Sequence, residues 1–447
     1  MTIWTLIFAL AALAFWLLSV YRDGGIGIGS RFFFAAILVL YFLAGPLLRA
    51  AFATKEYDTF GVSEYGDAAV QLVSLGLISF VAAAYWAFPA FCRQGSLIPS
   101  DLLRRMASRE RLKSERLGAW MLAVFGAIVF LLTLVIGRIP TLAALLGSIS
   151  GAFDAALSMF CLVAVASRRF KMLWIVALAW IARSVLVAAA SGHIGGMLFQ
   201  GMVLVCYTWF TADIRPQRII VALLLIALLY VPYQRWMAGR DDLRQAIANG
   251  EDLSERLSIT SRILFDPGEK ADRGHNFVEG YCSRGDFSAL MAAAIRTTPS
   301  AEPFAYGATF CDAATAVVPR FLWPEKPYLA GISNTVIVSR YTGINFGSNT
   351  CVQMNYLFEF YINFGVTGCV IGMFLAGLLC AGIEMWFYTG GLKDVSVEWT
   401  VLLINSSIIL SIDNFAMLAM TLPPVLAASW LLNLCFKYQS QRQMANG

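Results

Sequence analysis

The sequence predicts an all-α polytopic membrane protein with about eleven transmembrane helices and one large periplasmic loop that contains short amphipathic helices. Three observations support this fold class. Hydrophobic residues make up 59% of the 447 positions and charged residues only 14%, a balance that the surface of a water-soluble protein would hardly accommodate. Apolar windows of spanning length recur along the chain. Short connections rich in Lys and Arg fall on the same side of the membrane when the spans alternate, as cytoplasmic loops do.

The apolar windows come first, because a helix needs about 20 apolar residues to cross a bilayer. Windows that meet this requirement begin near Ile3, Phe32, Ala68, Gly118, Gly151, Met172, Met197, Ile219, Phe364, Val397 and Leu418. The first window has no basic region before it and continues as an apolar run, so we expect a retained span rather than a cleaved signal peptide. Residues 1–447 are therefore interpreted as a single integral membrane domain.

The basic residues orient these spans. Arg and Lys are densest between Arg93 and Arg116, which assigns this connection to the cytoplasm. Alternation from there places the N-terminus and the connections 53–66, 138–150 and 191–196 outside. The same alternation places the whole segment 235–351 outside.

The segment 235–351 concentrates charged residues, and its apolar runs are shorter than a span. Because long loops without a function are uncommon, we interpret it as a large periplasmic loop that carries the active site. Phe287 to Ile295 has helical apolar spacing, and Thr309 to Val318 has it more weakly. Both are predicted to be short amphipathic helices at the membrane surface. Cys282 and Cys311 also lie in the loop. Two alternatives stay open for them, a disulfide between them or two free thiols.

Prolines divide the most informative string of the loop, Pro319-Arg-Phe-Leu-Trp-Pro-Glu-Lys-Pro327. They exclude a continuous helix and favour a stiff extended segment. Arg320 and Lys326 would then stand at a fixed separation, as in a clamp for an anion such as phosphate. Trp323 suits the membrane interface and offers a ring on which a sugar can stack. The alternative is a basic anchor beside an aromatic belt.

Charged residues inside spans are costly unless they are paired or face a polar cavity. Arg183 lies in the middle of the span Trp180-Ile-Ala-Arg-Ser-Val, and we expect it to face such a cavity or an acid such as Asp154. Glu359 lies where a span enters the bilayer after the loop. We expect it to point inward, either as a base or, by slight preference, as the structural partner of an arginine.

Three strings follow one another in the chain: Tyr306-Gly-Ala-Thr-Phe310, the Pro319 to Pro327 string, and Glu359-Phe-Tyr-Ile-Asn-Phe-Gly-Val-Thr-Gly368. Together they resemble the oligosaccharide repeat unit polymerases, the Wzy-type family of O-antigen and exopolysaccharide polymerases. The motif-level similarity covers about Arg284 to Gly368. It implies a multi-pass glycosyltransferase of the bacterial inner membrane, active at the periplasmic face without a nucleotide sugar, metal or other cofactor.

The resemblance implies that a growing glycan is transferred from undecaprenyl diphosphate to the terminal sugar of a new lipid-linked repeat unit. The implied partners are the lipid-linked donor and acceptor and the membrane lipid, with a chain-length regulator and a flippase as further candidates. Nothing indicates a nucleic-acid partner. The chain has nine cysteines but no CxxC or Cys/His spacing, so no metal site is predicted.

This chemistry needs cations for the leaving diphosphate and a base for the acceptor hydroxyl. Four basic residues of the loop are candidates for binding the diphosphate: Arg284, Arg320, Lys326 and Arg340. Glu279 and Asp286, which flank Arg284, are the preferred candidates for the base. His275 is the histidine of the loop and the next candidate. A salt bridge from Arg284 to Asp286 or Glu279 is the structural alternative.

Two other functions stay open. An O-antigen ligase-like glycan transferase also has many helices and a large late periplasmic loop. A non-enzymatic membrane transporter would use embedded acids such as Asp154 and Asp413, although a pump is expected to repeat such acids along several helices beside Gly or Pro breaks. Here they are isolated, which favours the polymerase.

Overall fold

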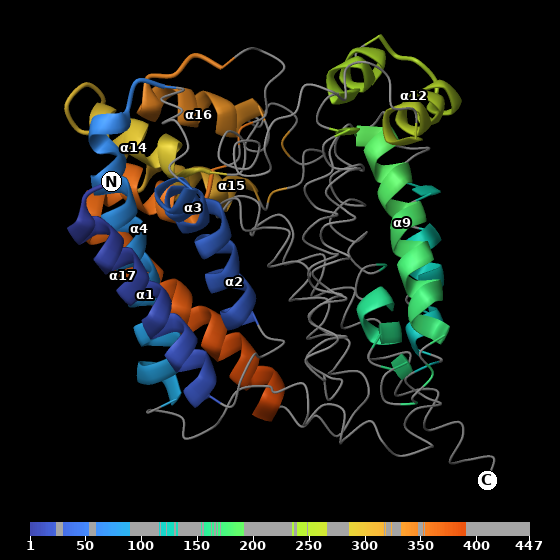
Figure 1. Ribbon diagram of the computed structural model, residues 1–447, viewed down its shortest axis with the longest axis horizontal. Coiled ribbons are helices and arrows are strands. Elements are labelled where there is room, and N and C mark those ends of the chain that lie inside the picture. Colours follow the sequence, from blue (N-terminus) through green and yellow to red (C-terminus); the bar gives the residue numbers. More distant parts are fainter. Residues whose placement is uncertain are drawn as a thin grey trace. The chain divides into compact units, whose positions relative to one another are not determined.

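The structure, a computed structural model, contains helices joined by turns and irregular segments in the part of the chain that it describes (Figure 1). The described residues are 1–23, 30–52, 60–89, 116, 118–121, 123–128, 131–132, 153, 156–161, 163–164, 167, 169, 171–191, 235–236, 239–247, 249–265, 286–316, 318, 323, 332–346, 352 and 354–389. No strand occurs among these residues, which agrees with the predicted all-α class.

The chain divides into two compact units. Unit 1 comprises Met1–Ile98, Ile136–Gly151 and Val278–Gly447, and unit 2 comprises Pro99–Val135 and Ala152–Phe277. The described helices of unit 1 are α1 (Ile3–Arg22), α2 (Ser30–Leu38), η1 (Val39–Leu43), α3 (Ala44–Phe52), η2 (Ser63–Tyr65), α4 (Gly66–Val81), η3 (Ala82–Ala87), α14 (Ser288–Thr297), α15 (Ala308–Ala316), α16 (Ile332–Thr342) and α17 (Tyr356–Thr389). Unit 2 contains α9 (Lys171–Ser191) and α12 (Leu253–Phe265).

Five helical segments in the described part are long and apolar enough to cross a membrane. They are Ile3–Arg22, Ser30–Phe52, Ser63–Ala87, Lys171–Ala190 and Tyr356–Gly382. These segments confirm the windows predicted near Ile3, Phe32, Ala68, Met172 and Phe364, the last of which begins earlier than expected. The windows near Met197, Ile219, Val397 and Leu418 lie outside the described residues, and those near Gly118 and Gly151 are described only in part.

Helix α4 packs against both α1 and α17, and these three helices lie side by side in Figure 1. The core between α2 and α4 contains the buried rings of Phe34 and Phe80, which stack with their centroids 4.6 Å apart. The opposite face of α1 leaves large apolar side chains exposed: Ile3, Trp4, Ile7, Leu10, Leu17 and Leu18. An apolar stripe of this length is costly in water and matches the hydrocarbon of a bilayer.

One end of unit 1 is closed by a buried ionic contact. The Nε of Arg31, at the start of α2, lies 2.6 Å from Oε2 of Glu384 near the end of α17, and its Nη2 lies 3.3 Å from Oδ2 of Asp23, which follows α1. Arg31 also donates to the carbonyl oxygen of Ala84 in η3 at 3.0 Å. Because these helix ends meet here, the start of α1, the end of α3 and the start of α4 share the other end of the unit.

Helices α14, α15 and α16 lie at that other end (Figure 1). Helices α14 and α15 confirm the helices predicted for Phe287 to Ile295 and Thr309 to Val318, whereas α16 and α12 were not predicted. The expected amphipathic surface position does not hold for α14. Residues Leu290 to Ala294 are all buried, and consecutive helical residues point in all directions around the axis. Helix α14 is therefore enclosed by its neighbours, among them α4 and α16.

Candidate functional site

Helix α17 is broken at Gly365, where φ is 65° and ψ is −150°. This conformation is accessible essentially only to glycine. The residues before the break, 356–364, fold back on those after it: Sγ of Cys369 lies 3.5 Å from the carbonyl oxygen of Leu357, although a straight helix would separate these residues by about 18 Å. The segment is a helical hairpin, with its turn at Gly365.

Two glycines allow the two arms of this hairpin to approach closely. A Cβ atom at Gly368 would lie 2.5 Å from the carbonyl oxygen of Phe360, and one at Gly372 would overlap the Phe360 ring. A larger side chain at either position would push the arms apart. Gly365 and Gly368 belong to the string Glu359 to Gly368, so the glycines singled out in the sequence have a direct steric role.

A short stretch of the loop, residues 304–309, caps this break, and we call it the capping segment. The amide of Ala305 donates to the carbonyl oxygen of Ile362 at 2.8 Å, and the amide of Tyr306 donates to that of Asn363 at 3.2 Å. These two carbonyls belong to the last turn before the break, where helix carbonyls otherwise lack partners. The capping segment therefore replaces the hydrogen bonds that the break removes.

Asn363 joins the capping segment to the hairpin through its side chain. Its Oδ1 accepts from the amide of Gly307 at 2.8 Å, and its Nδ2 donates to Oγ1 of Thr309 and to the carbonyl oxygen of Glu359, both at 2.7 Å. The side chain is completely buried. A buried amide with its groups satisfied fixes a single geometry, because an unpaired polar group would be costly there.

The capping segment brings together two of the three strings singled out in the sequence, Tyr306 to Phe310 and Glu359 to Gly368. Tyr306 has a φ of 47°, and it is the only non-glycine residue with a positive φ in the described part of the chain. Its side chain is 75% exposed. Phe304 packs against Gly365 and places its ring edge-on to the rings of Tyr306 and Tyr361.

A buried ion pair joins the start of the loop helices to α3. Nη2 of Arg49 contacts Oδ2 of Asp286, whose side chain has no exposed surface. Oδ1 of Asp286 accepts from the amide of Ser288 at 2.8 Å. The carboxylate lies against Gly45, where a Cβ atom would come within 2.5 Å of its Cγ. Burial raises the pKa of the Asp286 carboxyl, and the Arg49 charge acts in the opposite direction.

The same docking uses the π-helical turn η1 in the preceding span. A π-helical turn interrupts the regular α-helical hydrogen bonding and is frequent at functional sites. The carbonyl oxygen of Tyr41 in η1 accepts from the amide of Phe287 at 2.8 Å, and the two rings meet edge-on with centroids 4.9 Å apart. A backbone hydrogen bond, a ring contact and an ion pair thus hold residues 286–287 against the helical segment 30–52.

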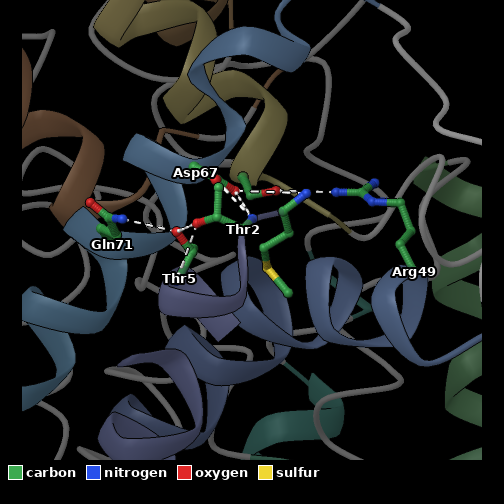
Figure 2. A network of polar contacts seen from close by, with 7 residues as sticks. Thr2, Thr5, Arg49, Asp67 and Gln71 are labelled. Atoms are coloured by element: carbon green, nitrogen blue, oxygen red, sulfur yellow. Dashed lines mark hydrogen bonds and ion pairs between the residues drawn. The ribbon is translucent and has the colours of Figure 1, made fainter. Parts of the chain in front are cut away.

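Figure 2 shows the Arg49 guanidinium pointing toward a polar cluster at the start of α1 and α4. In this cluster, Asp67 accepts from the amide of Thr2 at 2.9 and 3.2 Å, and Gln71 donates to Oγ1 of Thr5 at 2.9 Å. Arg49 itself is 21% exposed. This end of unit 1 therefore carries a cluster of exposed and half-buried polar groups, with the partly accessible Arg49 cation beside it.

The C-terminal end of α14 holds three further segments in place. Nη1 of Arg296 donates to the carbonyl oxygens of Phe60 and Gly61, both at 3.2 Å, and Oγ1 of Thr297 donates to that of Thr342 at 3.0 Å. The Tyr361 hydroxyl donates to the carbonyl oxygen of Thr298 at 3.0 Å. The connection before α4, the end of α16 and the hairpin of α17 are thus tied to one helix.

The structure describes five of the residues predicted for the site. Asp286 lies in the pair with Arg49. Glu359 is buried in the first arm of the hairpin, as expected for a residue that points inward. Arg340 on α16 is exposed and forms an ion pair with Glu302, 2.6 Å from its Oε1. Trp323 is 41% exposed. Arg183 lies on α9 of unit 2, 5.9 Å from the ring centroid of Phe153.

The other predicted residues, His275, Glu279, Arg284, Arg320 and Lys326, lie outside the described residues, so their roles stay predictions. Asp154, the expected partner of Arg183, also lies outside them. Cys311 is exposed and not in a disulfide, so the alternative of a Cys282–Cys311 bridge is wrong for this structure.

Sequence patterns missed Arg49, Asn363 and the conformation of Tyr306. Arg49 ends an apolar window and resembles an ordinary flanking residue, and its partner Asp286 is 237 positions away. The available signal was Gly45-Pro46, an unusual pair within a span directly before Arg49. For Asn363 the signal was a polar amide between apolar residues at the edge of a span.

Comparison with known proteins identifies a family. A family model described as "Domain of unknown function (DUF8712)" matches residues 101–387, a range that includes the capping segment and most of the hairpin. No curated protein and no solved structure matches the chain.

Proposed function

Since the chain belongs to the DUF8712 family, whose function is unknown, we propose its function from the site: it is a glycosyltransferase that polymerises undecaprenyl-diphosphate-linked oligosaccharide repeat units into O-antigen or exopolysaccharide. In this proposal the chain crosses the bacterial inner membrane about eleven times. The segment 235–351 is its periplasmic loop and carries the active site.

The observation that carries the proposal is the capped break of α17. Two of the three strings on which the resemblance to repeat unit polymerases rests meet there through three hydrogen bonds: Tyr306 to Asn363, Gly307 to Asn363, and Asn363 to Thr309. Ala305, directly before the first string, adds a fourth to Ile362. Strings that only anchored the loop at the membrane would not need to form hydrogen bonds with each other. A single rigid structure that presents exposed loop residues is instead what a site needs to position a substrate.

The proposed reaction transfers the growing glycan. An acceptor hydroxyl oxygen attacks the anomeric carbon of the donor sugar, the bond from that carbon to the phosphate oxygen breaks, and undecaprenyl diphosphate leaves with the electron pair. The hydroxyl proton passes to a carboxylate of the loop, Glu279 or Asp286, or to His275.

Cations stabilise the charge that develops on the leaving diphosphate. The proposed residues are Arg284, Arg320, Lys326 and Arg340, with Trp323 as a ring for sugar stacking. Arg49 joins them, because its guanidinium lies at the same end of unit 1 as α16 and is held by Asp286. With these side chains neutralising the diphosphate, the reaction needs no metal or other cofactor.

The geometry bears on the roles of two acids. Both oxygens of Asp286 are engaged, by Arg49 and by the Ser288 amide, and the side chain is buried. Asp286 therefore orients Arg49 in this structure, and Glu279 is the preferred base within the proposal. Glu359 lies in the first arm of the hairpin, where a structural role is favoured, as it was from the sequence.

A transporter is the second candidate, because broken helices often form ion and substrate sites in secondary transporters. In such sites the unwound carbonyls coordinate the ion. Here the carbonyls of Ile362 and Asn363 at the break already accept from Ala305 and Tyr306. This occupancy favours the capped, rigid role of the break over ion coordination.

Glycan products separate these functions. In a deletion strain of the source bacterium, loss of a polymerase leaves single repeat units on the acceptor, whereas loss of a ligase-like transferase leaves long chains on undecaprenyl diphosphate. The purified protein with lipid-linked repeat units should lengthen glycans, and should do so in EDTA. Activity that EDTA abolishes and a divalent ion restores would contradict metal independence. Substrate flux into liposomes without lengthening would support the transporter.

A further inference from the structure

We propose that the ring of Tyr306 is a stacking platform for a sugar of the lipid-linked glycan. This inference rests on the proposed function and names a substrate contact for the same site. Tyr306 is the only described non-glycine residue with a positive φ.

The conformation of Tyr306 is imposed by its neighbours. The amides of residues 305, 306 and 307 all donate to atoms of Ile362 or Asn363, and Asn363 is completely buried. A bulky side chain in the left-handed region is destabilising, and glycine or asparagine would suit the position better. Strain that the surrounding structure maintains is typical of functional residues.

Stability does not account for the tyrosine ring either. The side chain is 75% exposed, and its described ring contact is the edge of Phe304 at 6.2 Å. An exposed aromatic ring on a rigid turn gains little from the protein itself. The hydrogen bonds of the turn come from main-chain groups, so any residue could form them. The presence of an aromatic ring at position 306 is therefore best explained by contact with a ligand.

The surroundings favour a sugar over a lipid chain as this ligand. Four residues before Tyr306, Glu302 pairs with Arg340, whose side chain is 62% exposed. Six residues after it, Asp312 on α15 is exposed. Charged groups avoid hydrocarbon, so the turn lies in water. The occupant is therefore a polar molecule with an apolar face, as a pyranose ring has.

The experiment uses the full-length protein in nanodiscs and four variants. Tyr306→Phe keeps the ring, Tyr306→Leu keeps only an apolar side chain, and Tyr306→Gly removes the side chain and the backbone strain. Tyr21→Leu is the matched control, because Tyr21 is 83% exposed and lies at the other end of unit 1. Two properties are measured: the kinetics of chain lengthening with lipid-linked repeat units, and saturation-transfer NMR with the repeat-unit oligosaccharide released from its lipid.

We expect Tyr306→Gly to unfold at the wild-type temperature or higher, because the φ strain is relieved. In Tyr306→Gly and Tyr306→Leu, KM for the acceptor should rise about 10- to 100-fold, equivalent to about 1.4 to 2.8 kcal/mol, with kcat little changed because a binding contact is lost. Their NMR signal from the oligosaccharide should disappear. Tyr306→Phe keeps the ring and should therefore keep the NMR signal, and Tyr21→Leu should behave like the wild type.

The other outcomes are equally informative. Wild-type KM and NMR signal in Tyr306→Gly would overturn the inference. Normal behaviour of Tyr306→Leu alone would mean that the Tyr306 side chain contacts an apolar chain and not a sugar, which would also overturn it. If the wild type binds the oligosaccharide through Tyr306 but lengthens nothing, the proposed function fails while the binding site stands. If the wild type lengthens glycans and all variants equal it, only the inference fails.

Discussion

Arg49 and Asp286 illustrate how a residue's partner sets its role. Asp286 was predicted as a base because it follows Arg284 in a charged stretch of the loop. The structure places it against Arg49, in a space that Gly45 leaves open. In that position the Asp286 carboxylate fixes the orientation of the Arg49 guanidinium. A double variant that removes both charges tests whether Asp286 also accepts a proton from the substrate.

Our first prediction concerns this pair. Arg49→Met leaves a buried carboxylate without its partner, which should cost about 3 to 5 kcal/mol of unfolding free energy. The double variant Arg49→Met/Asp286→Leu removes both charges and should recover most of this loss, because an apolar pair replaces a buried ion pair well. Thermal unfolding in nanodiscs measures the cycle. Additive single effects would mean that the pair contributes nothing.

The same double variant separates the roles of Asp286. If Asp286 orients Arg49, the stable double variant should lose lengthening activity in proportion to the loss of Arg49→Met alone. Glu279→Gln should then stop chain growth, since a base contributes about 10²- to 10⁴-fold. Full activity of Glu279→Gln with an inactive Asp286→Asn would return the base to Asp286, and full activity of both would move it to His275, Glu359 or the substrate.

The second residue-level prediction concerns Arg320, which lies outside the described residues. If Arg320 binds the diphosphate through a bidentate contact, Arg320→Lys keeps the charge but loses the planar fork. Both Arg320→Lys and Arg320→Ala should lose about 30- to 1,000-fold in rate, or about 2 to 4 kcal/mol, at normal levels in the membrane. Polymer of wild-type length from Arg320→Lys would leave Arg320 as a basic anchor at the interface.

At the level of the element, the hairpin of α17 depends on one backbone conformation. Gly365→Ala should cost about 1 to 3 kcal/mol, because φ 65° and ψ −150° are essentially closed to other residues, and its Cβ would meet the Phe304 ring at 3.1 Å. Gly250→Ala is the control, since Gly250 has a φ of 75° with no atom within 4 Å, and it should cost about 1 kcal/mol.

Unfolding midpoints of the two variants test this difference, and lengthening activity tests its consequence. Gly365→Ala should lower both, because the capping segment that carries Tyr306 is bonded to the turn. An unchanged midpoint together with normal activity would show that α17 can run straight through residue 365 without loss.

At the level of the whole molecule, the helix ends predict a topology. The start of α1, residues 60–61 and helices α14 to α16 share one end of unit 1, while Asp23 and Glu384 share the other. Reporter fusions at Gly61 and Pro299 should therefore give the same, external signal, and a fusion at Asp23 the cytoplasmic one. A fusion at Gly447 should also report cytoplasm. Signals from Gly61 and Pro299 on different sides of the membrane would contradict the fold of unit 1, and two cytoplasmic signals would exclude periplasmic chemistry.

Hydropathy alone predicted the five described helices that are long and apolar enough to cross a membrane, and apolar periodicity predicted two of the shorter helices, α14 and α15. These features depend on local composition and periodicity, because each helix must match the bilayer or a core face by itself. The strings Tyr306 to Phe310 and Glu359 to Gly368 were also visible, but only as neighbours in sequence.

Tertiary structure decided how these pieces act. The break at Gly365, the capping bonds of Asn363, the pairing of Arg49 with Asp286 and the enclosure of α14 all join segments distant in the chain. A sequence pattern carries no information on which distant group satisfies a given carbonyl or charge. In a membrane protein that choice is strongly constrained, since every buried polar group must find its partner within the fold.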